Sequence, residues 1–361
     1  RMMEWLRDSM GIPPAFEGVI QDSASSAYLV ALITAREVAT GFRSNEEGVP
    51  ANLRIYCSSE THSSIEKAVA VCGIGKRNLV KVGTNARLQM DPALLENAIL
   101  KDLEEGLIPC ALVATLGTTG TLATDPLKEI AVLCKKHGIW LHVDAAYAGT
   151  ALLLPEYRWM IEGIEEVDSF VFNPHKWMFT NFDCSVYFVK DASTLIRTFE
   201  VLPEYLKTSS RGQVNDYRDW AVPLGRRFRA LKLWFVIRSF GLNGIREKLR
   251  QHISLSQFFC KGLASVEAVH IPVEPFLNFS CFRLQPEGIT DPEILNPLNK
   301  AFLEEINRSG ELYLTHTKID TLYTLRMVIG QTYVNQEHVE LALQRITEAA
   351  RYSLDRFRQN A

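Results

Sequence analysis

The chain of 361 residues is longer than a single hydrophobic core usually extends, so two domains are expected. A hydrophobic share of 47%, a charged share of 22% and a net charge of −3 are ordinary values for a globular protein. No long basic or acidic run is present, and no apolar stretch is long enough to span a bilayer, which argues against nucleic acid or a membrane as partner.

The seven cysteines are scattered and include no Cys-x-x-Cys pair. An odd number of widely spaced cysteines is typical of reduced thiols in a cytoplasmic protein, so neither a disulfide framework nor a metal site is expected. No secretory signal peptide is recognisable. Arg1 lies inside an amphipathic pattern that extends to Met10, and we expect residues 1–17 to be the remnant of a longer N-terminal segment.

The first part of the chain alternates between helical and strand-like patterns. Helices are predicted over Ser23–Thr40 and Asp125–His137. Strands of apolar character are predicted over Asn52–Cys57, Pro109–Leu116, Ile139–Val143, Ser169–Phe172 and Ser185–Val189. Apolar strands separated by helices are typical of a mainly parallel sheet with helices on both faces, and we predict such an α/β domain over residues 18–231.

Beyond Leu231 the pattern changes. A helix-like stretch is followed by two strand-like runs, Asn278–Leu284 and Thr321–Ile329, and a closing helix is predicted over Gln336–Tyr352. This order is typical of a smaller α+β domain, which we predict over residues 232–361.

Lys176 follows the strand Ser169–Phe172 inside the sequence Asn-Pro-His-Lys-Trp. Ligands of parallel-sheet proteins bind beyond the carboxyl ends of the strands, so a polar residue at this position is a candidate for a functional site. A partly desolvated lysine has a lowered pKa, and its neutral amine can form a Schiff base with a carbonyl group. Its position alone is better explained by a surface lysine.

Asp144 follows another predicted strand, inside the sequence His-Val-Asp-Ala-Ala-Tyr. A buried carboxylate needs a cationic partner or hydrogen-bond donors. The protonated ring nitrogen of pyridoxal phosphate is such a partner, and the two alanines that follow leave room for a flat ring. The alternative is an aspartate that caps the next helix.

Two weaker signals accompany these residues. His62 follows the strand Asn52–Cys57, where its imidazole could stack on a cofactor ring, but a histidine with no catalytic role is equally consistent with the spacing. The cluster Ser23–Ser26 precedes a helix, whose N-terminus favours an anion such as a phosphate, although serines there are more often plain caps.

Together these segments resemble the group II pyridoxal-phosphate-dependent amino-acid decarboxylases, and in particular those that act on aromatic L-amino acids. The matching segments, in chain order, are residues 18–25, 61–64, 114–120, 142–149, 173–177, 181–184, 203–207, 216–220 and 223–228. They extend over most of the chain, and the complete ordered set is far more specific than any one motif.

The resemblance implies a fold type I enzyme that binds pyridoxal phosphate and works as a homodimer, with the active site at the subunit interface. It implies that Lys176 is the Schiff-base lysine, that Asp144 pairs with the ring nitrogen, and that His62 stacks on the ring. The other residues implied around the cofactor are Ala24, Ser25 and Asn173 at the phosphate, Thr119 and Ala146 beside the ring, and His175 near the substrate carboxylate.

Tyr205 matches a family tyrosine on a mobile loop that reaches the partner subunit's site and protonates the substrate carbon after CO2 leaves. The segment Leu202–Asn215 is rich in Ser, Gly and Lys, as a mobile lid should be. Without the resemblance, Tyr205 would be interpreted as a surface tyrosine. Gly225 matches a substrate-binding position that varies between Gly and Ser, and a glycine there leaves space for a large ring such as indole.

The implied reaction converts an aromatic L-amino acid (tryptophan, 5-hydroxytryptophan, DOPA, tyrosine or phenylalanine) to the arylalkylamine and CO2. Related aldehyde synthases tend to carry Phe in place of Tyr205, and some carry Asn in place of His62, so the amine is the favoured product. An aromatic acetaldehyde synthase and a pyridoxal-phosphate-binding protein without turnover remain as alternatives. A nicotinamide enzyme is disfavoured because no Gly-x-Gly-x-x-Gly follows a strand near the N-terminus.

Overall fold

The computed structural model describes residues 1–201 and 215–360. The chain forms two compact units: Arg1–Thr119 with Ala123–Leu242, and Gly120–Leu122 with Asn243–Ala361. The units divide within helix α9 (Arg229–Leu263), next to Gly241, whose positive φ of 66° interrupts the helix. The sequence pattern places this boundary earlier, at residue 231.

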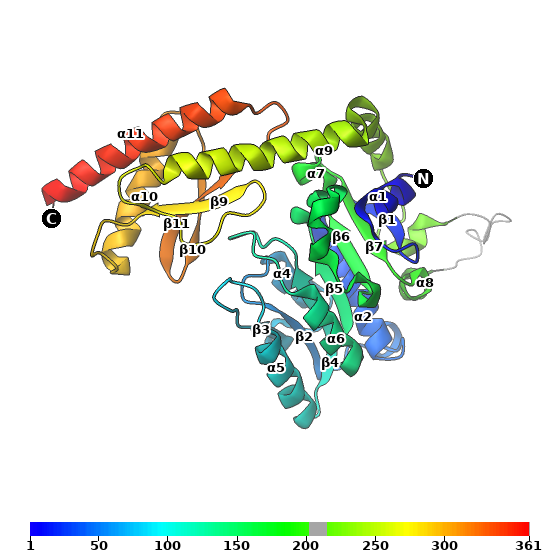
Figure 1. Ribbon diagram of the computed structural model, residues 1–361. Helices are drawn as coiled ribbons and strands as arrows, with labels where there is room; N and C mark the ends of the chain where they lie inside the picture. Colours follow the sequence, from blue (N-terminus) through cyan, green and yellow to red (C-terminus); the bar gives the residue numbers. More distant parts are fainter. Residues whose placement is uncertain (202–214, 361) are drawn as a thin grey trace. The chain divides into compact units, whose positions relative to one another are not determined.

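A seven-stranded sheet runs through the first unit in the order β1-β7-β6-β5-β4-β2-β3 (Figure 1). Its strands are β1 (Glu17–Gln21), β2 (Leu53–Ser58), β3 (Leu79–Val82), β4 (Ile108–Thr115), β5 (Trp140–Asp144), β6 (Ser169–Phe172) and β7 (Ser185–Val189). Strand β7 is antiparallel to β1 and β6, and the other neighbouring strands are parallel. The predicted α/β fold with a mainly parallel sheet is confirmed.

Helices cover both faces of this sheet (Figure 1). The helices of the first unit before α9 are α1 (Met2–Met10), α2 (Ala24–Ala39), α3 (Ser44–Glu47), α4 (Ser64–Val71), α5 (Pro92–Glu104), α6 (Leu127–His137), α7 (Pro174–Trp177) and α8 (Ala192–Phe199). On one face α2 lies across the central strands and packs against α4, whereas α5 and α6 contact β4 from the other face. The turn of 3-10 helix η2 (Ala148–Leu153) follows β5.

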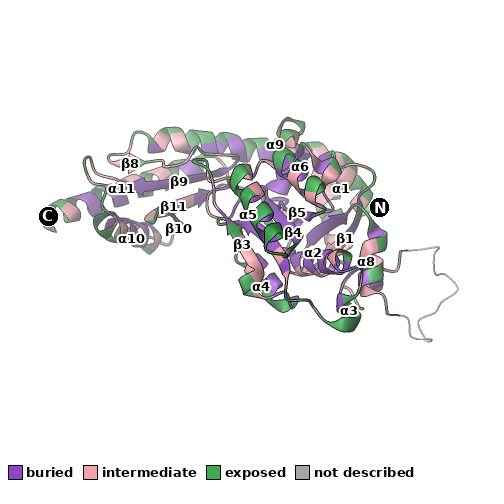
Figure 2. Cartoon of the chain, turned by 90° about the horizontal axis from the view of Figure 1, so that it is seen from below, coloured by how far each residue is buried: buried purple, intermediate pink, exposed green. Residues whose placement is uncertain are grey.

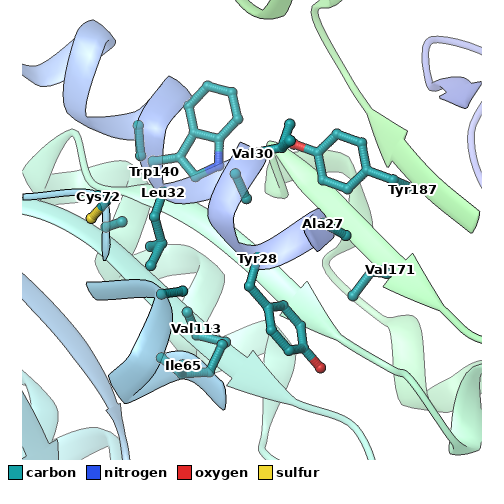
Figure 3. Close-up of a cluster of buried hydrophobic side chains, with 14 of the residues drawn as sticks. Ala27, Tyr28, Val30, Leu32, Ile65, Cys72, Val113, Trp140, Val171 and Tyr187 are labelled. Atoms are coloured by element: carbon teal, nitrogen blue, oxygen red, sulfur yellow. The ribbon is translucent and has the colours of Figure 1, made fainter. Parts of the chain in front are cut away.

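The main core lies between α2 and the sheet. Tyr28 and Val30 of α2 pack with Val113 of β4, Trp140 of β5 and Tyr187 of β7 (Figure 3). The strands of the sheet are mostly buried (Figure 2), because both of their faces are covered. Burial of this apolar surface holds the ends of the strands in fixed positions.

The second unit contains a four-stranded antiparallel sheet in the order β10-β11-β9-β8. Its strands and helices are β8 (Val269–His270), β9 (Phe279–Leu284), β10 (Thr315–Ile319), β11 (Leu322–Val328), α10 (Pro292–Arg308) and α11 (Gln336–Asn360). Phe282 of β9 makes edge-to-face contacts with Phe259 at 5.9 Å and Phe302 at 6.3 Å between ring centroids. The arrangement is the α+β fold that the sequence predicts for this region.

Replacement of Gly149 by Ala should destabilise the first unit. A Cβ at this position would lie 2.5 Å from the Cβ of Phe172 and 3.1 Å from that of Ala145, and neither atom is the end of a flexible side chain. We expect a loss of about 2 kcal/mol in the free energy of unfolding, measured in urea. In Gly262→Ala the nearest atoms are the methyl groups of Leu343, which can rotate away, so this variant should lose less. Equal stability of Gly149→Ala and the unmodified protein would contradict the packing described here.

Candidate active site

The parallel strands β2, β4, β5 and β6 end at the same edge of the large sheet. The chain passes from β2 to β3 on one side and from β4 to β5 on the other, so the strand order reverses between β2 and β4. Ligands in open α/β sheets bind outside the carboxyl ends of the strands at such a point. A cavity of about 250 Å³ lies at this edge, where residues that follow these four strands meet the N-terminus of α2.

The cavity brings together nine residues that the sequence places around a cofactor: Ala24, Ser25, His62, Thr119, Asp144, Ala146, Asn173, His175 and Lys176. Gly225 is not among the lining residues, and a Cβ added to it would meet open space. Tyr205 lies outside the described residues. The cavity is also lined by residues that the sequence did not single out for the site, namely Tyr28, Ser64, Gly117 and Tyr147.

Lys176 is positioned by α7, a single helical turn that starts at Pro174 and follows β6 directly. Proline is favoured at the first position of a helix because its φ is already helical. Water reaches the Lys176 side chain through the cavity, yet the surrounding protein atoms desolvate its ammonium form and lower its pKa below the usual value. The Asp144 carboxylate acts in the opposite direction. The result is an amine that loses its proton more readily than a surface lysine.

Asp144 is the last residue of β5 and is 4% exposed. Its Oδ1 accepts a hydrogen bond from the backbone N–H of Ala146 at 3.0 Å. The Tyr28 hydroxyl lies beside the same carboxylate, and burial together with this carboxylate holds the pKa of Tyr28 well above its usual value. Asp144 therefore presents a negative charge at the wall of the cavity, as the ring nitrogen of pyridoxal phosphate requires.

The N-terminus of α2 forms the opposite kind of site, one suited to an anion. Ser23 caps the helix by accepting a hydrogen bond from the N–H of Ser26 at 3.2 Å. The N–H groups of Ala24 and Ser25, in the first turn, have no acceptor within the helix. Asn173 accepts a hydrogen bond from the Ser185 hydroxyl at 2.6 Å, which leaves its amide N–H groups as donors. These donors match a phosphate group.

Two histidines at the cavity have their Nδ1 atoms occupied. The Nδ1 of His62 accepts the N–H of Ser64 at 3.2 Å and lies 2.6 Å from the hydroxyl of the same serine. The Nδ1 of His175 accepts the N–H of Cys184 at 2.9 Å. Burial, with a further contribution from Lys176, lowers the pKa of His175. In its neutral form, each ring therefore carries its proton on Nε2 and can donate it to a ligand.

The segment that follows Lys176 is fixed by an ion pair. The Asp183 carboxylate accepts two hydrogen bonds from Arg229, from Nε at 3.1 Å and from Nη2 at 3.0 Å, and Lys232 lies 3.4 Å away. The next residue, Cys184, bonds to His175 through its backbone, so this ion pair helps to hold the His175 ring. Phe182 packs against the same ring with its centroid 4.9 Å away.

Three larger hollows lie elsewhere in the described residues. One of about 520 Å³ is lined by residues of α10 and α11, none of them a lysine. The other two have volumes of about 690 and 680 Å³. The first is lined by residues of β11 and α11, and the second by residues of α1, β1 and the start of α9. Neither lining contains a lysine, so neither has the amine and buried carboxylate found at the smaller cavity. The chemistry therefore favours the smaller cavity over the larger ones.

A lysine with a lowered pKa, a buried carboxylate and a helix N-terminus suited to a phosphate, on a seven-stranded α/β sheet, define a fold type I enzyme that uses pyridoxal phosphate. Residues 1–285 match the pyridoxal-dependent decarboxylase conserved domain. The chain belongs to this family of pyridoxal-dependent decarboxylases and is a carboxy-lyase.

Similar proteins with known names come from plants. Tyrosine decarboxylase 4 of Petroselinum crispum is 38% identical over 98% of this chain and 72% of its own length. Phenylacetaldehyde synthase of Arabidopsis thaliana is 39% identical over 98% of this chain and 74% of its own. The crystal structure of Oryza sativa TDC with PLP and tryptamine superposes with a TM-score of 0.93 at 33% identity, covering 97% of this chain and 75% of the other.

Residues 1–201 and 215–360 contain neither a candidate metal site nor a candidate membrane span. No three His, Cys, Asp or Glu side chains gather there in a way that could hold a metal ion. No helix in the same residues has both the length and the apolar character needed to cross a bilayer. All seven cysteines are free thiols.

The Asp183 ion pair should contribute to stability in a pH-dependent way. Arg229 lowers the pKa of Asp183 from 3.8 to about 2, and the carboxylate is mostly shielded from water. The stabilisation is then fully present above pH 4 and is lost as the pH falls towards 2. Asp183→Asn should lower the free energy of unfolding by about 2 kcal/mol at pH 7.

Urea unfolding at pH 7, 5 and 3 measures this effect. The difference between Asp183→Asn and the unmodified protein should be the same at pH 7 and pH 5 and smaller at pH 3. A difference that does not change at pH 3 would show that the carboxylate charge is not responsible.

Proposed function

We propose that this enzyme decarboxylates an aromatic L-amino acid to the arylalkylamine, with Lys176 holding the cofactor covalently. The observation that carries the proposal is the position of the Lys176 amine and the Asp144 carboxylate at one cavity, beside the N-terminus of α2. The plant relatives support an aromatic substrate, since they include a tyrosine decarboxylase and a tryptophan decarboxylase of Oryza sativa, each 38% identical. Which aromatic amino acid is preferred is a question for experiment.

The residues at the cavity fit pyridoxal phosphate at three points. The N–H groups of Ala24 and Ser25 and the amide of Asn173 would hold the phosphate. The Asp144 carboxylate would keep the ring nitrogen protonated. Once bound, pyridoxal phosphate supplies the electron sink for the electron pair left on the substrate when CO2 departs.

The remaining side chains have roles in binding and proton transfer. Thr119 and Ala146 would line the ring, and His62 would stack on it and donate from its Nε2–H. His175 would be neutral because its pKa is lowered, and it would donate a hydrogen bond to the substrate carboxylate. A neutral donor forms no ion pair with that carboxylate, and an ion pair would oppose the loss of CO2. Tyr205 would then give a proton to the substrate carbon that has lost CO2.

Lys176→Ala should abolish turnover, because no other described residue places an amine at this cavity. Purified enzyme with added pyridoxal phosphate would be incubated separately with L-tryptophan, L-tyrosine, L-DOPA and L-histidine, and amine, aldehyde and peroxide would be measured. Borohydride reduction followed by mass spectrometry should locate the cofactor on Lys176 in the unmodified enzyme. Unchanged activity of Lys176→Ala would refute the assignment.

An aromatic acetaldehyde synthase is the second candidate, because the relatives include phenylacetaldehyde synthases at 39% identity. The presence of Tyr205 and His62 favours the amine, since related synthases tend to replace the first and some replace the second. Aldehyde formed together with peroxide would favour this candidate. Bound cofactor without any product would favour a binding protein without turnover.

We further propose a cytoplasmic homodimer with the active site at the subunit interface. Apolar side chains at the start of α9 and just before it are strongly exposed on the single chain: Val222 (62%), Leu224 (65%), Phe228 (76%) and Phe235 (58%). A patch of this kind marks a surface that another protein covers. Gly225 lies within it, so a second copy could bring Gly225 to a site that its own chain does not reach. Free cysteines are typical of a reducing compartment.

Mixing two variants tests whether Tyr205 acts across the interface. Lys176→Ala should give no product, and Tyr205→Phe should form little amine. After subunit exchange, a mixed dimer would contain one site with both Lys176 and Tyr205, so amine formation should return. Subunit exchange would be verified with two affinity tags. No recovery in a dimer that carries both tags would show that Tyr205 serves its own subunit.

A further inference from the structure

Tyr28 is a cavity-lining residue that has no role in the reaction described so far. It projects from α2 and is only 3% exposed, in the core cluster between that helix and the sheet (Figure 3). Its ring packs edge-on against His142, with the centroids 5.7 Å apart and the planes at 76°. His142 is two residues before Asp144 on β5, so both side chains lie on the face of the sheet that α2 covers.

The packing of Tyr28 therefore directs its hydroxyl to the carboxylate at the end of β5. Asp144 accepts a hydrogen bond from the Ala146 backbone, and the Tyr28 hydroxyl lies beside the same carboxylate as a second potential donor. Because burial and the nearby carboxylate raise the pKa of Tyr28, the phenol stays protonated and acts as a donor at every pH that the protein tolerates.

Three other titratable groups lie near the Asp144 carboxylate. Lys176 of α7 attracts it, whereas the buried Asp125, which follows β4, repels it. Burial raises the pKa of Asp125 to about 6, so its repulsion increases as the pH rises through that value. The side chain of His142 has its pKa lowered to about 3 by burial and is uncharged near neutral pH. Tyr28 is thus a neutral donor that offsets the repulsion from Asp125 without adding a competing charge.

We propose that Tyr28 is a positioning residue for pyridoxal phosphate, which acts through Asp144 by holding its carboxylate turned towards the ring nitrogen. The proposal rests on the role proposed above for Asp144. Two donors on one carboxylate limit its rotation and stabilise its charge. The ring nitrogen then meets an anion that is already oriented when the cofactor binds.

A purely structural role would make Tyr28 equivalent to Tyr187, the other tyrosine of the cluster. Tyr187 also contacts His142, in a stacked arrangement with centroids 6.1 Å apart, and is completely buried. Its hydroxyl lies beside Ser169 and not beside Asp144. The two hydroxyls point in different directions (Figure 3). Tyr187→Phe is therefore a matched control, since it removes the same atom from the same cluster.

The test compares Tyr28→Phe with Tyr187→Phe in the whole protein. Apoenzyme would be titrated with pyridoxal phosphate at neutral pH, and the dissociation constant and the visible absorption spectrum of the bound cofactor would be recorded. Tyr28→Phe should bind about tenfold more weakly and show an altered spectrum, because a donor to the carboxylate that faces the ring nitrogen is lost. Tyr187→Phe should match the unmodified enzyme.

Asp144→Asn separates failure of this proposal from failure of the proposed function. If Asp144→Asn binds the cofactor weakly but Tyr28→Phe behaves like Tyr187→Phe, Tyr28 is an ordinary core residue and the proposal is overturned. If Asp144→Asn binds normally, the role of Asp144 itself is wrong, and with it the proposal.

Adding Tyr28→Phe to Asp144→Asn should weaken cofactor binding no further. Tyr28→Met, which fills a similar space without a hydroxyl, provides a second measurement should the Phe variant not fold. Circular dichroism and thermal unfolding would establish that each variant is folded before titration.

Discussion

A buried carboxylate constrains the residues around it, because an ionised group away from water must be paired with donors or with a cation. At the end of β5, Asp144 meets this requirement with the Ala146 backbone, the Tyr28 hydroxyl and the charge of Lys176. Each comes from a different part of the chain, and their positions are set by the parallel strands and by α2. These groups meet where the parallel strands end, and the cavity lies at the same edge of the sheet.

The strand pattern predicts much of the fold. The strands Ser169–Phe172 and Ser185–Val189 have the bounds expected from the sequence, since continuous burial produces uninterrupted apolar runs. The sequence pattern does not predict β1, β3, β8 and β10, and the reason is physical. All four are edge strands; β8 and β3 are only two and four residues long, and β10, Thr-His-Thr-Lys-Ile, is largely polar and exposed. Edge strands do not need the apolar pattern on which such predictions depend.

The site was predictable to the extent that its residues follow strands. Asp144 and Lys176 could be placed together because parallel strands end at one edge of a sheet, and the structure brings both to one cavity. Tyr28 could not be found in this way. It lies inside an apolar helix and resembles any other core residue in the sequence, and only the register of α2 over β5 reveals that its hydroxyl meets Asp144.

The pairing of β1 with β7 has a consequence for how the protein is made. Val19 lies opposite Tyr187, so the first strand has no partner until more than half of the chain has left the ribosome. Until then β1 remains an open edge, and α2 has only part of the sheet to cover, with its apolar side chains in water. Such long-range contacts slow folding, and until they form, apolar surfaces and unpaired strand edges remain exposed. The helix whose N-terminus is suited to the cofactor phosphate therefore reaches its final surroundings only after β7 has been made, and until then its apolar face can associate with other chains.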